Sequence, residues 1–488
     1  MERRDIIRSL TILPFAGGFR PIESILSPVT GPLEPGQNIY QSIGVEPVIN
    51  CVGTYTIIGG SIERPEVVEA MHAASGFFVQ YDELALGIGR RLAELTKAEW
   101  GMISSGCAAG MKHVTSACIA GGNPEKLVRI PDLTGFDKTE VVIPRSSRNA
   151  YDHSIRNIGV TIITVDTLEE LGKALNARTA MIYVMTGRDT LPGNKFAIDK
   201  IAALAKPLNI PFLVDAAAED LTIPNVHLQA GATVVAYSGG KAICGPQCAG
   251  LLLGQKDILM SAWQASSPHH GTGRDNKVGK EEMLGMLAAV EAWVKRDHEA
   301  KYRTWLGYLD VISKRVSAVS GVTVTLGEPA DLNNRSPWLI ISWDPARLNV
   351  AGPEIAEMLA QTQPRIAVHS GSNEQDKTTF LRVTSGQMQP GNDKIVADRI
   401  FELLSKKYPE PKEMTAPSGD ISGRWTVDIQ FYSSKSQHTF ILEQDGNWIQ
   451  GSHKGDFSFR EMVGTIEGDQ VKLSSSERMI ADNVPFIF

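Results

Sequence analysis

The sequence predicts an α/β fold with a mostly parallel sheet, followed by a small α+β unit and an all-β tail. Three observations support this. Short apolar runs alternate with helical patterns from residue 49 to about 301, a shorter mixture of strands and helices follows, and the residues beyond 420 alternate between apolar and polar side chains. The first pattern is typical of a parallel sheet covered by helices, and the last is typical of antiparallel strands.

The expected strands of the large domain are short apolar runs bounded by turn residues. Runs of this kind between helical patterns indicate strands that are buried on both faces. Amphipathic stretches at 168–176 and 197–209 predict helices between them. The strands are expected at 101–104, 140–143, 161–165, 181–185, 212–215, 234–238 and 250–254.

A helical pattern from about 280 to 309 leaves the large domain, and a smaller α+β unit follows it. Strands are expected there at 338–343 and 379–384, and helices at 353–361 and 394–406.

The tail has a different character. Residues 407–420 contain three prolines with serine and glycine among charged residues, which indicates a linker. Beyond it, Asp445-Gly446 is a hairpin signal and Glu467-Gly468-Asp469 predicts another turn. About four or five strands cannot close a barrel alone. We therefore expect part of a small barrel or sandwich, incomplete or completed by packing on the main body.

These patterns predict five segments. They are an N-terminal tail at 1–35, an arm with the large domain at 36–310, the small α+β domain at 311–406, the linker at 407–420 and the β-rich tail at 421–488.

The bulk composition excludes several classes of protein. The chain has 488 residues, 42% hydrophobic and 21% charged, with a formal net charge of -7. An acidic balance argues against a nucleic-acid-binding surface, and no apolar run approaches the roughly 20 residues that span a bilayer. Five scattered cysteines indicate structural thiols, not disulfides or a zinc site, so we expect no metal.

The first residues resemble an export signal. Arg3-Arg4-Asp5-Ile6-Ile7-Arg8 has the paired arginines of a twin-arginine signal, and a short, weakly apolar stretch follows. That route moves folded, cofactor-loaded proteins. The expectation is export to the periplasm; the alternative is a disordered tail on a cytoplasmic protein.

An acid and a lysine mark the ends of two neighbouring strands. Asp215 closes the run 211–214, and Lys241 follows the run 233–237 in the segment Ser238-Gly239-Gly240-Lys241. Pyridoxal 5'-phosphate (PLP) needs a lysine for its Schiff base and a carboxylate that keeps the pyridine nitrogen protonated. A surface lysine after a strand is the alternative. The small residues before Lys241 favour the cofactor, because they let the backbone approach a ligand closely.

A second segment adds a phosphate site. Ser105, Gly106 and Cys107 follow the strand at 101–104 and open a helix, where backbone N–H groups and the helix dipole attract an anion. Ser238 can donate a further hydrogen bond to the phosphate.

Arg382 lies among apolar residues in the strand 379–384 of the small domain. A buried arginine usually has an anionic partner, and its planar guanidinium can bind a substrate carboxylate through two hydrogen bonds. A structural ion pair is the alternative.

These segments resemble the branch of fold-type I PLP enzymes that contains selenocysteine synthase and D-glucosaminate-6-phosphate ammonia-lyase. The resemblance covers residues 40 to 410 and excludes the β tail. The matching segments are 49–54, 83–84, 91–96, 104–109, 148–153, 215–217, 238–241 and 277–281.

The resemblance implies an aspartate aminotransferase-like PLP-dependent transferase fold. It also implies that an aromatic ring stacks on the pyridine, for which His153 is the first candidate and Tyr151 the second; a solvated His153 is the alternative. In related dimers a loop like 267–277 reaches the neighbouring subunit. Arg274 and Lys277 are therefore expected to hold an anionic substrate group, unless they are solvated loop charges.

The expected activity is that of a PLP-dependent lyase of the ammonia-lyase or dehydratase type. Its substrate would be a small hydroxy-amino acid or amino sugar acid, and the enzyme a homodimer or higher homo-oligomer. The alternatives are a racemase, aldolase, aminotransferase or selenium transferase on the same scaffold, or a binding protein that kept the fold without the chemistry.

Overall fold

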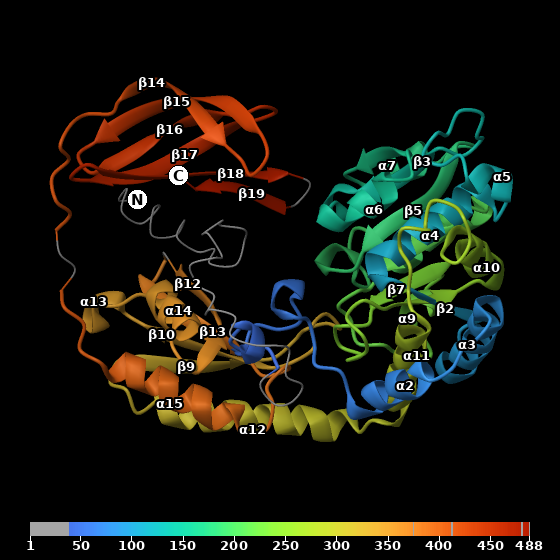
Figure 1. Cartoon of the computed structure of the whole chain (residues 1–488), viewed down its shortest axis with the longest axis horizontal. Coiled ribbons are helices and arrows are strands. Elements are labelled where there is room, and N and C mark those ends of the chain that lie inside the picture. Colours follow the sequence, from blue (N-terminus) through green and yellow to red (C-terminus); the bar gives the residue numbers. More distant parts are fainter. Residues whose placement is uncertain (1–38, 374, 411–412, 480–481, 488) are drawn as a thin grey trace. The chain divides into compact units, whose positions relative to one another are not determined.

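The computed structural model describes residues 39–487, apart from 374, 411–412 and 480–481 (Figure 1). Contacts divide the chain into two units, each described by itself. One contains residues 53–305 and 328–337, and the other contains the remaining described residues. The twin-arginine-like segment at residues 3–8 lies outside the described residues.

A seven-stranded sheet forms the centre of the first unit. Its order is β2-β8-β7-β6-β5-β3-β4, and every neighbouring pair from β7 to β4 is parallel. β8 is antiparallel to both β2 and β7. The mostly parallel sheet predicted from the sequence is confirmed. The strands are β2 (Trp100–Ser104), β3 (Glu140–Pro144), β4 (Thr161–Val165), β5 (Thr179–Met185), β6 (Phe212–Asp215), β7 (Val234–Ser238) and β8 (Gly250–Gly254).

The central strands are apolar throughout because they are buried on both faces. Every residue of β2, β6 and β8 is buried. Helix α4 (Gly106–Ala120) packs against β5, β6, β7 and β8, and nearly all of its residues are buried (Figure 1). The other long helices of this unit are α2 (Pro65–Ser75), α3 (Tyr81–Thr96), α8 (Ile198–Ala205), α10 (Lys256–Ala265) and α11 (Lys280–Lys295).

The single helix expected at 280–309 is wrong. Two helices occupy this stretch, α11 and α12 (His298–Val316), with Arg296 in an extended conformation between them. The Asp297 carboxylate accepts the N–H of Ala300 at 2.8 Å, which satisfies a free donor in the first turn of the new helix. The apolar periodicity continues across the break, so it did not reveal the corner.

The small α+β domain contains a four-stranded antiparallel sheet in the order β12-β13-β10-β9. The strands at β10 (Trp338–Trp343) and β13 (Thr378–Thr384) were expected, as were helices α14 (Gly352–Gln361) and α15 (Asn392–Ser405). Two strands that were not predicted, β9 (Val322–Gly327) and β12 (His369–Asn373), complete the sheet.

Contacts place two short segments differently from the expected boundaries. β1 (Val48–Asn50), in the predicted arm, pairs in parallel with β11 (Arg365–Ala367) of the small domain. Conversely, residues 328–337 join the large domain, where the Asn334 N–H donates to the Ala218 carbonyl at 2.8 Å. Neither segment has an apolar pattern long enough to reveal its partner.

The C-terminal tail is a six-stranded antiparallel meander rather than the four or five strands expected. Glycines 446 and 468 have φ values of 58° and 59° at the two predicted turns, a region that favours glycine. Its small core consists of Phe440, Leu442, Ile449, Met462, Ile466 and Leu473. The strands are β14 (Gly423–Gln430), β15 (Lys435–Asp445), β16 (Trp448–Lys454), β17 (Phe459–Glu467), β18 (Gln470–Met479) and β19 (Asp482–Ile487).

Two histidines are buried inside this meander. His438 Nδ1 lies 2.7 Å from His453 Nε2, and His453 Nδ1 lies 2.6 Å from the Ser475 hydroxyl. The His438 ring also faces the Asp456 carboxylate at 3.5 Å. Within the part of the chain that the structure describes, no helix is long and apolar enough to cross a membrane.

Candidate functional site

Asp215 lies at the carboxyl end of β6, where parallel sheets usually bind ligands. Its side chain is buried. One carboxylate oxygen accepts the Tyr183 hydroxyl at 2.9 Å, and the other accepts the Ala217 N–H at 3.0 Å. Burial raises the pKa of Asp215, while these two hydrogen bonds and the charge of Lys241 oppose the rise. The carboxylate is therefore fixed in direction and close to a positive charge.

Tyr183 and Asn149 belong to this network, although the sequence did not single out either residue's role. Asn149 donates to the Tyr183 hydroxyl at 3.1 Å, so the hydroxyl is oriented toward Asp215. Tyr183 is a phenol in the middle of the apolar strand β5, next to β6. A lone polar tip in a buried strand needs a partner, and this signal could have identified it.

Lys241 follows β7 in a tight turn. The Cys244 N–H donates to the Lys241 carbonyl at 3.0 Å, and the Gly245 N–H donates to the Gly239 carbonyl at 2.9 Å. β6 and β7 are parallel neighbours with Asp215 opposite Ala236, so the acid and the lysine leave the same edge of the sheet. The charge of Lys241 affects the pKa of both Asp215 and Cys107. The structure thus brings together the predicted pair.

The beginning of α4 lies against the same edge. Gly106 has a φ of 81°, and a Cβ on Gly250 would lie 2.4 Å from its carbonyl carbon. Glycine at both positions lets the backbone of β8 approach the helix start closely. Ser105 precedes the helix and makes no capping hydrogen bond with its side chain. The first N–H groups of an α-helix have no partner within the helix and attract anions. Binding of the cofactor phosphate at the start of α4 stays a prediction.

Cys107 lies in the first turn of α4, as expected, and its role in cofactor binding stays a prediction. Its Sγ lies 3.6 Å from the Asp215 carboxylate, and burial followed by the Asp215 charge raises its thiol pKa. The side chain therefore packs beside the acid, and only its backbone belongs to the helix start. Ser238 ends β7 and is partly buried, with its N–H donating to the Ala217 carbonyl at 3.3 Å.

These residues fit PLP. A buried carboxylate, held by a phenol and an N–H, suits a protonated ring nitrogen, since an ion pair offsets the desolvation of both charges. The uncapped helix start suits a phosphate, and the lysine at the end of the adjacent strand suits the cofactor's aldehyde.

His153 and Tyr151, the two stacking candidates, are both exposed. Both belong to the short helical turns after β3, and α6 (His153–Arg156) packs against α4. Between them, Asp152 is fully buried and pairs with Arg148 at 2.5 Å and Arg156 at 2.8 Å. The ion pairs anchor this segment, so that the adjacent His153 side chain stays at the surface. Stacking by His153 stays a prediction.

Arg274 and Lys277 are exposed on the loop before α11. Asp275 between them forms an ion pair with Lys112 of α4 at 2.8 Å, which ties the loop to the helix. Within the described residues, neither Arg274 nor Lys277 has a side-chain partner. Their predicted role in binding a substrate anion is untested.

Arg382 lies on β13 of the second unit. Its guanidinium carbon is 4.2 Å from the centroid of the Trp338 ring, a cation–π contact. This contact accounts for an arginine in a largely buried strand. A role in substrate binding stays a prediction.

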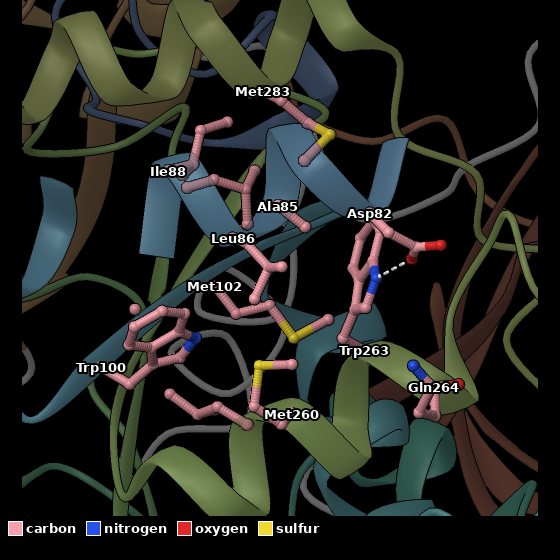
Figure 2. A pocket seen from close by; sticks show the side chains of 13 residues that line it. Asp82, Ala85, Leu86, Ile88, Trp100, Met102, Met260, Trp263, Gln264 and Met283 are labelled. Atoms are coloured by element: carbon pink, nitrogen blue, oxygen red, sulfur yellow. Dashed lines mark hydrogen bonds between the residues drawn. The ribbon is translucent and has the colours of Figure 1, made fainter. Parts of the chain in front are cut away.

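A cavity of about 180 Å³ lies elsewhere in the large domain (Figure 2). It is lined by apolar side chains of α3, β2, α10 and α11, including Trp100, Met102 and Met260. Its polar edge is Asp82, which accepts the Trp263 indole N–H at 2.7 Å. None of the predicted site residues lines it. A nearly apolar cavity without converging polar groups lacks the features of a catalytic site.

Comparisons with known proteins agree with this geometry. Residues 147–282 match the aminotransferase class-V family. The chain is 31% identical over 312 residues to D-glucosaminate-6-phosphate ammonia lyase of Salmonella typhimurium (strain 14028s / SGSC 2262), covering 62% of this chain and 81% of that protein. It is 27% identical over 382 residues to 5'-C-glycyluridine monooxygenase-decarboxylase of a Streptomyces species, covering 75% and 92%.

A solved structure of a D-glucosaminate-6-phosphate ammonia-lyase is similar in fold. It superposes with a TM-score of 0.67 at 26% identity, covering 75% of this chain and 98% of that chain. The predicted fold class, cofactor and enzyme class are therefore confirmed. The chain belongs to the fold-type I PLP-dependent enzymes, in the family of D-glucosaminate-6-phosphate ammonia lyase.

Proposed function

We propose that the chain is a PLP-dependent lyase that releases ammonia from a hydroxy-amino acid or an amino sugar acid. The observation that carries this proposal is the pairing of buried Asp215 with Lys241 at one sheet edge, in a chain 31% identical to an ammonia lyase.

PLP bound at this edge withdraws electrons from the Cα of an attached amine. Asp215 keeps the ring nitrogen protonated, and Tyr183 and Asn149 hold its carboxylate in place. The Lys241 amine would hold the cofactor before the substrate binds, and would then accept the α-proton and pass it to the β-hydroxyl, which would leave as water. The resulting enamine hydrolyses to an oxo acid and ammonia.

We further propose that Ser105, Gly106, Cys107 and Ser238 hold the cofactor phosphate, that His153 stacks on its ring, and that Arg382, Arg274 and Lys277 contact the substrate. The support is the uncapped start of α4 and the surface position of His153 beside it.

The test is an assay for ammonia and oxo acid over a panel of D- and L-hydroxyamino acids and amino sugar acids. We expect Lys241→Ala to reduce turnover at least about 10³-fold. Ammonia release by this variant at the wild-type rate would refute the assignment. Borohydride reduction should also leave a pyridoxyl group on the peptide that contains Lys241.

The same panel separates other reactions on this scaffold. A racemase gives the inverted substrate, an aldolase gives an aldehyde, and an aminotransferase needs an oxo-acid acceptor. A relative of the chain is named a monooxygenase-decarboxylase. Assays with and without O₂ are therefore needed: ammonia release that stops without O₂ contradicts a lyase.

We propose that the enzyme is a homodimer or a higher homo-oligomer. Several large apolar side chains near the start of the large domain are exposed, which single soluble subunits usually avoid in groups. Sedimentation velocity would test this, and a monomer at micromolar concentration would contradict it. The exposed side chains are Ile57 (65%), Ile62 (62%), Phe77 (72%) and Phe78 (103%).

We propose export by the twin-arginine route, on the basis of Arg3 and Arg4. Replacing both arginines by lysine should leave the protein in the cytoplasm of a host that exports the wild type. Equal periplasmic amounts of the two proteins would contradict the proposal.

A further inference from the structure

A group of positive charges surrounds the turn that carries Lys241. Arg64 precedes α2, and its N–H donates to the Cys244 carbonyl at 3.3 Å. Arg296 occupies the corner between α11 and α12, and Lys301 follows one turn into α12. The Arg64 charge contributes to lowering the pKa of both Arg296 and Lys301, and all three cations act to lower the pKa of the Cys244 thiol, which burial raises. The three cations therefore lie together.

Aromatic rings hold two of these cations in place. The indole of Trp305 lies 5.7 Å from the Arg296 guanidinium carbon and 5.7 Å from the Lys301 amine. The Trp293 ring lies 5.6 Å from the same guanidinium. Ring faces attract cations without neutralising them, so the positive charge of the group remains.

The group has few carboxylates. Glu66 pairs with Arg64 at 3.2 Å. Within the described chain, neither Arg296 nor Lys301 forms an ion pair. Burial and the neighbouring cations lower the pKa of Lys301, and burial with the Arg64 charge lowers that of Arg296. Charges of one sign at a half-buried site oppose each other, which a bound anion would relieve.

Hydrogen-bond donors in the group are also unused. Arg64 Nε and Trp305 Nε1 are buried and have no hydrogen-bond partner in the described structure. The Ser61 N–H donates to the Gly240 carbonyl at 3.0 Å, so this residue adjoins the Lys241 turn directly. Buried donors without an acceptor are rare in proteins and call for an explanation. An oxyanion supplies several acceptors at once.

We propose that Arg64, Arg296 and Lys301 form a binding site for the anionic end of the substrate, a phosphate or carboxylate remote from the amine that reacts at Lys241. The inference rests on the proposed function, because it assigns a part of that enzyme's substrate. It differs from the phosphate site at the start of α4, which holds the cofactor.

The test measures anion binding in protein that cannot turn over. PLP-loaded enzyme is first reduced with borohydride, which keeps the cofactor phosphate site occupied. Calorimetric titration with inorganic phosphate, and separately with succinate, is then carried out at constant ionic strength. We expect saturable binding of at least one anion to the wild type. Tighter binding of phosphate indicates a phosphate ester as substrate, and tighter binding of succinate indicates a dicarboxylate.

Variants locate the site. Arg296→Gln and Lys301→Gln should each weaken binding about tenfold, since each removes a charged donor. Lys295→Gln and Arg303→Gln, on the same two helices with side chains 76% and 67% exposed, should bind as the wild type does. Arg296→Lys keeps the charge and should retain most of the affinity. This variant distinguishes loss of the charge from misfolding caused by a change at Arg296.

Absence of saturable binding to the wild type overturns the proposal, as does equal affinity in Arg296→Gln and Lys295→Gln. Because the reduced enzyme needs no turnover, these results are independent of the ammonia assay. If the enzyme releases no ammonia but binds the anion, the proposed reaction would be rejected and the anion-binding site would remain supported.

Discussion

The large-domain sheet and the C-terminal meander use strands in opposite ways. In the first, parallel strands are buried on both faces, and the polar groups that matter, Asp215 and Lys241, gather at one edge. In the second, antiparallel strands alternate, and polar His438 and His453 lie inside a core of only six buried apolar residues. Polar groups at a sheet edge can reach a ligand. Buried polar groups such as this histidine pair affect the stability of the meander and its response to pH.

Replacing the acid should give the largest effect. Asp215→Asn should reduce ammonia release by about 10²–10³-fold, because the ring nitrogen loses its charged partner. The fold of the meander should be unchanged. Steady-state kinetics measure the loss. Asp166→Asn is a matched control, since Asp166 directly follows β4 but is exposed and pairs with Arg145. Equal losses in the two variants would contradict the role of Asp215.

Removing the largest side chain from the meander's core should destabilise the meander and leave catalysis unchanged. Phe440→Ala should lower the meander's free energy of unfolding by about 3 kcal/mol through lost burial and a cavity. The kcat for ammonia release should not change. Phe457→Ala, whose ring is 97% exposed, is the control. Urea unfolding followed by hydrogen exchange of β14–β18 measures the difference. A large drop in kcat for Phe440→Ala alone would show that the meander supports the site.

A smaller effect is expected from Tyr183→Phe. The hydroxyl lowers the pKa of Asp215, so its loss should raise that pKa further and move the acid limb of the pH–rate profile upward. Turnover at neutral pH should fall about tenfold or less, as for one hydrogen bond to a charged group. Tyr237→Phe is the control, because its hydroxyl contacts Asn225 at 2.6 Å instead. An unshifted profile for Tyr183→Phe would contradict the network.

The smallest expected effect is on the meander's pH response. Burial, the neighbouring His438 and Arg460 lower the pKa of His453 to about 4 from an ordinary value of 6.5. A histidine that is neutral when folded favours the folded state above its unfolded pKa. The meander should therefore lose stability as pH falls from about 6.5 to about 4. Hydrogen exchange of β16, corrected for intrinsic rates, should show this, and His453→Leu should reduce it. Constant protection across that range would contradict the assignment.

The large domain could be predicted well because its strands are short, largely apolar runs bounded by turn residues. Asp215 and Lys241 were identified for the same reason. A charged residue at the end of a buried strand lies at the edge of the sheet, because the sheet interior is apolar. Tyr183 was missed because its phenol lies within a run that otherwise indicates core. The partner that explains it comes from the neighbouring strand, and sequence spacing does not show that pairing.

Other features depend on contacts between distant residues. The strands β9 and β12 were not predicted, and they pair with the predicted strands β10 and β13 respectively. The corner at Arg296 depends on Asp297, which caps the start of a new helix. The apolar periodicity of the sequence does not reveal this corner. The cations near Lys241 come from two segments more than 200 residues apart in the sequence, Arg64 from one and Arg296 and Lys301 from the other, so no motif unites them. Residues 3–8 lie outside the described part, and their role rests on sequence alone.

The pairing of β1 with β11 has a consequence for biosynthesis. Val48 lies opposite Arg365, so the ribosome must produce the whole seven-stranded sheet before the partner of β1 exists. Until then the backbone groups of β1 bond to water and not to a partner strand, and the emerging polypeptide can bury its central layer first. The small domain is therefore completed late in translation, when β11 is made and pairs with the much earlier β1.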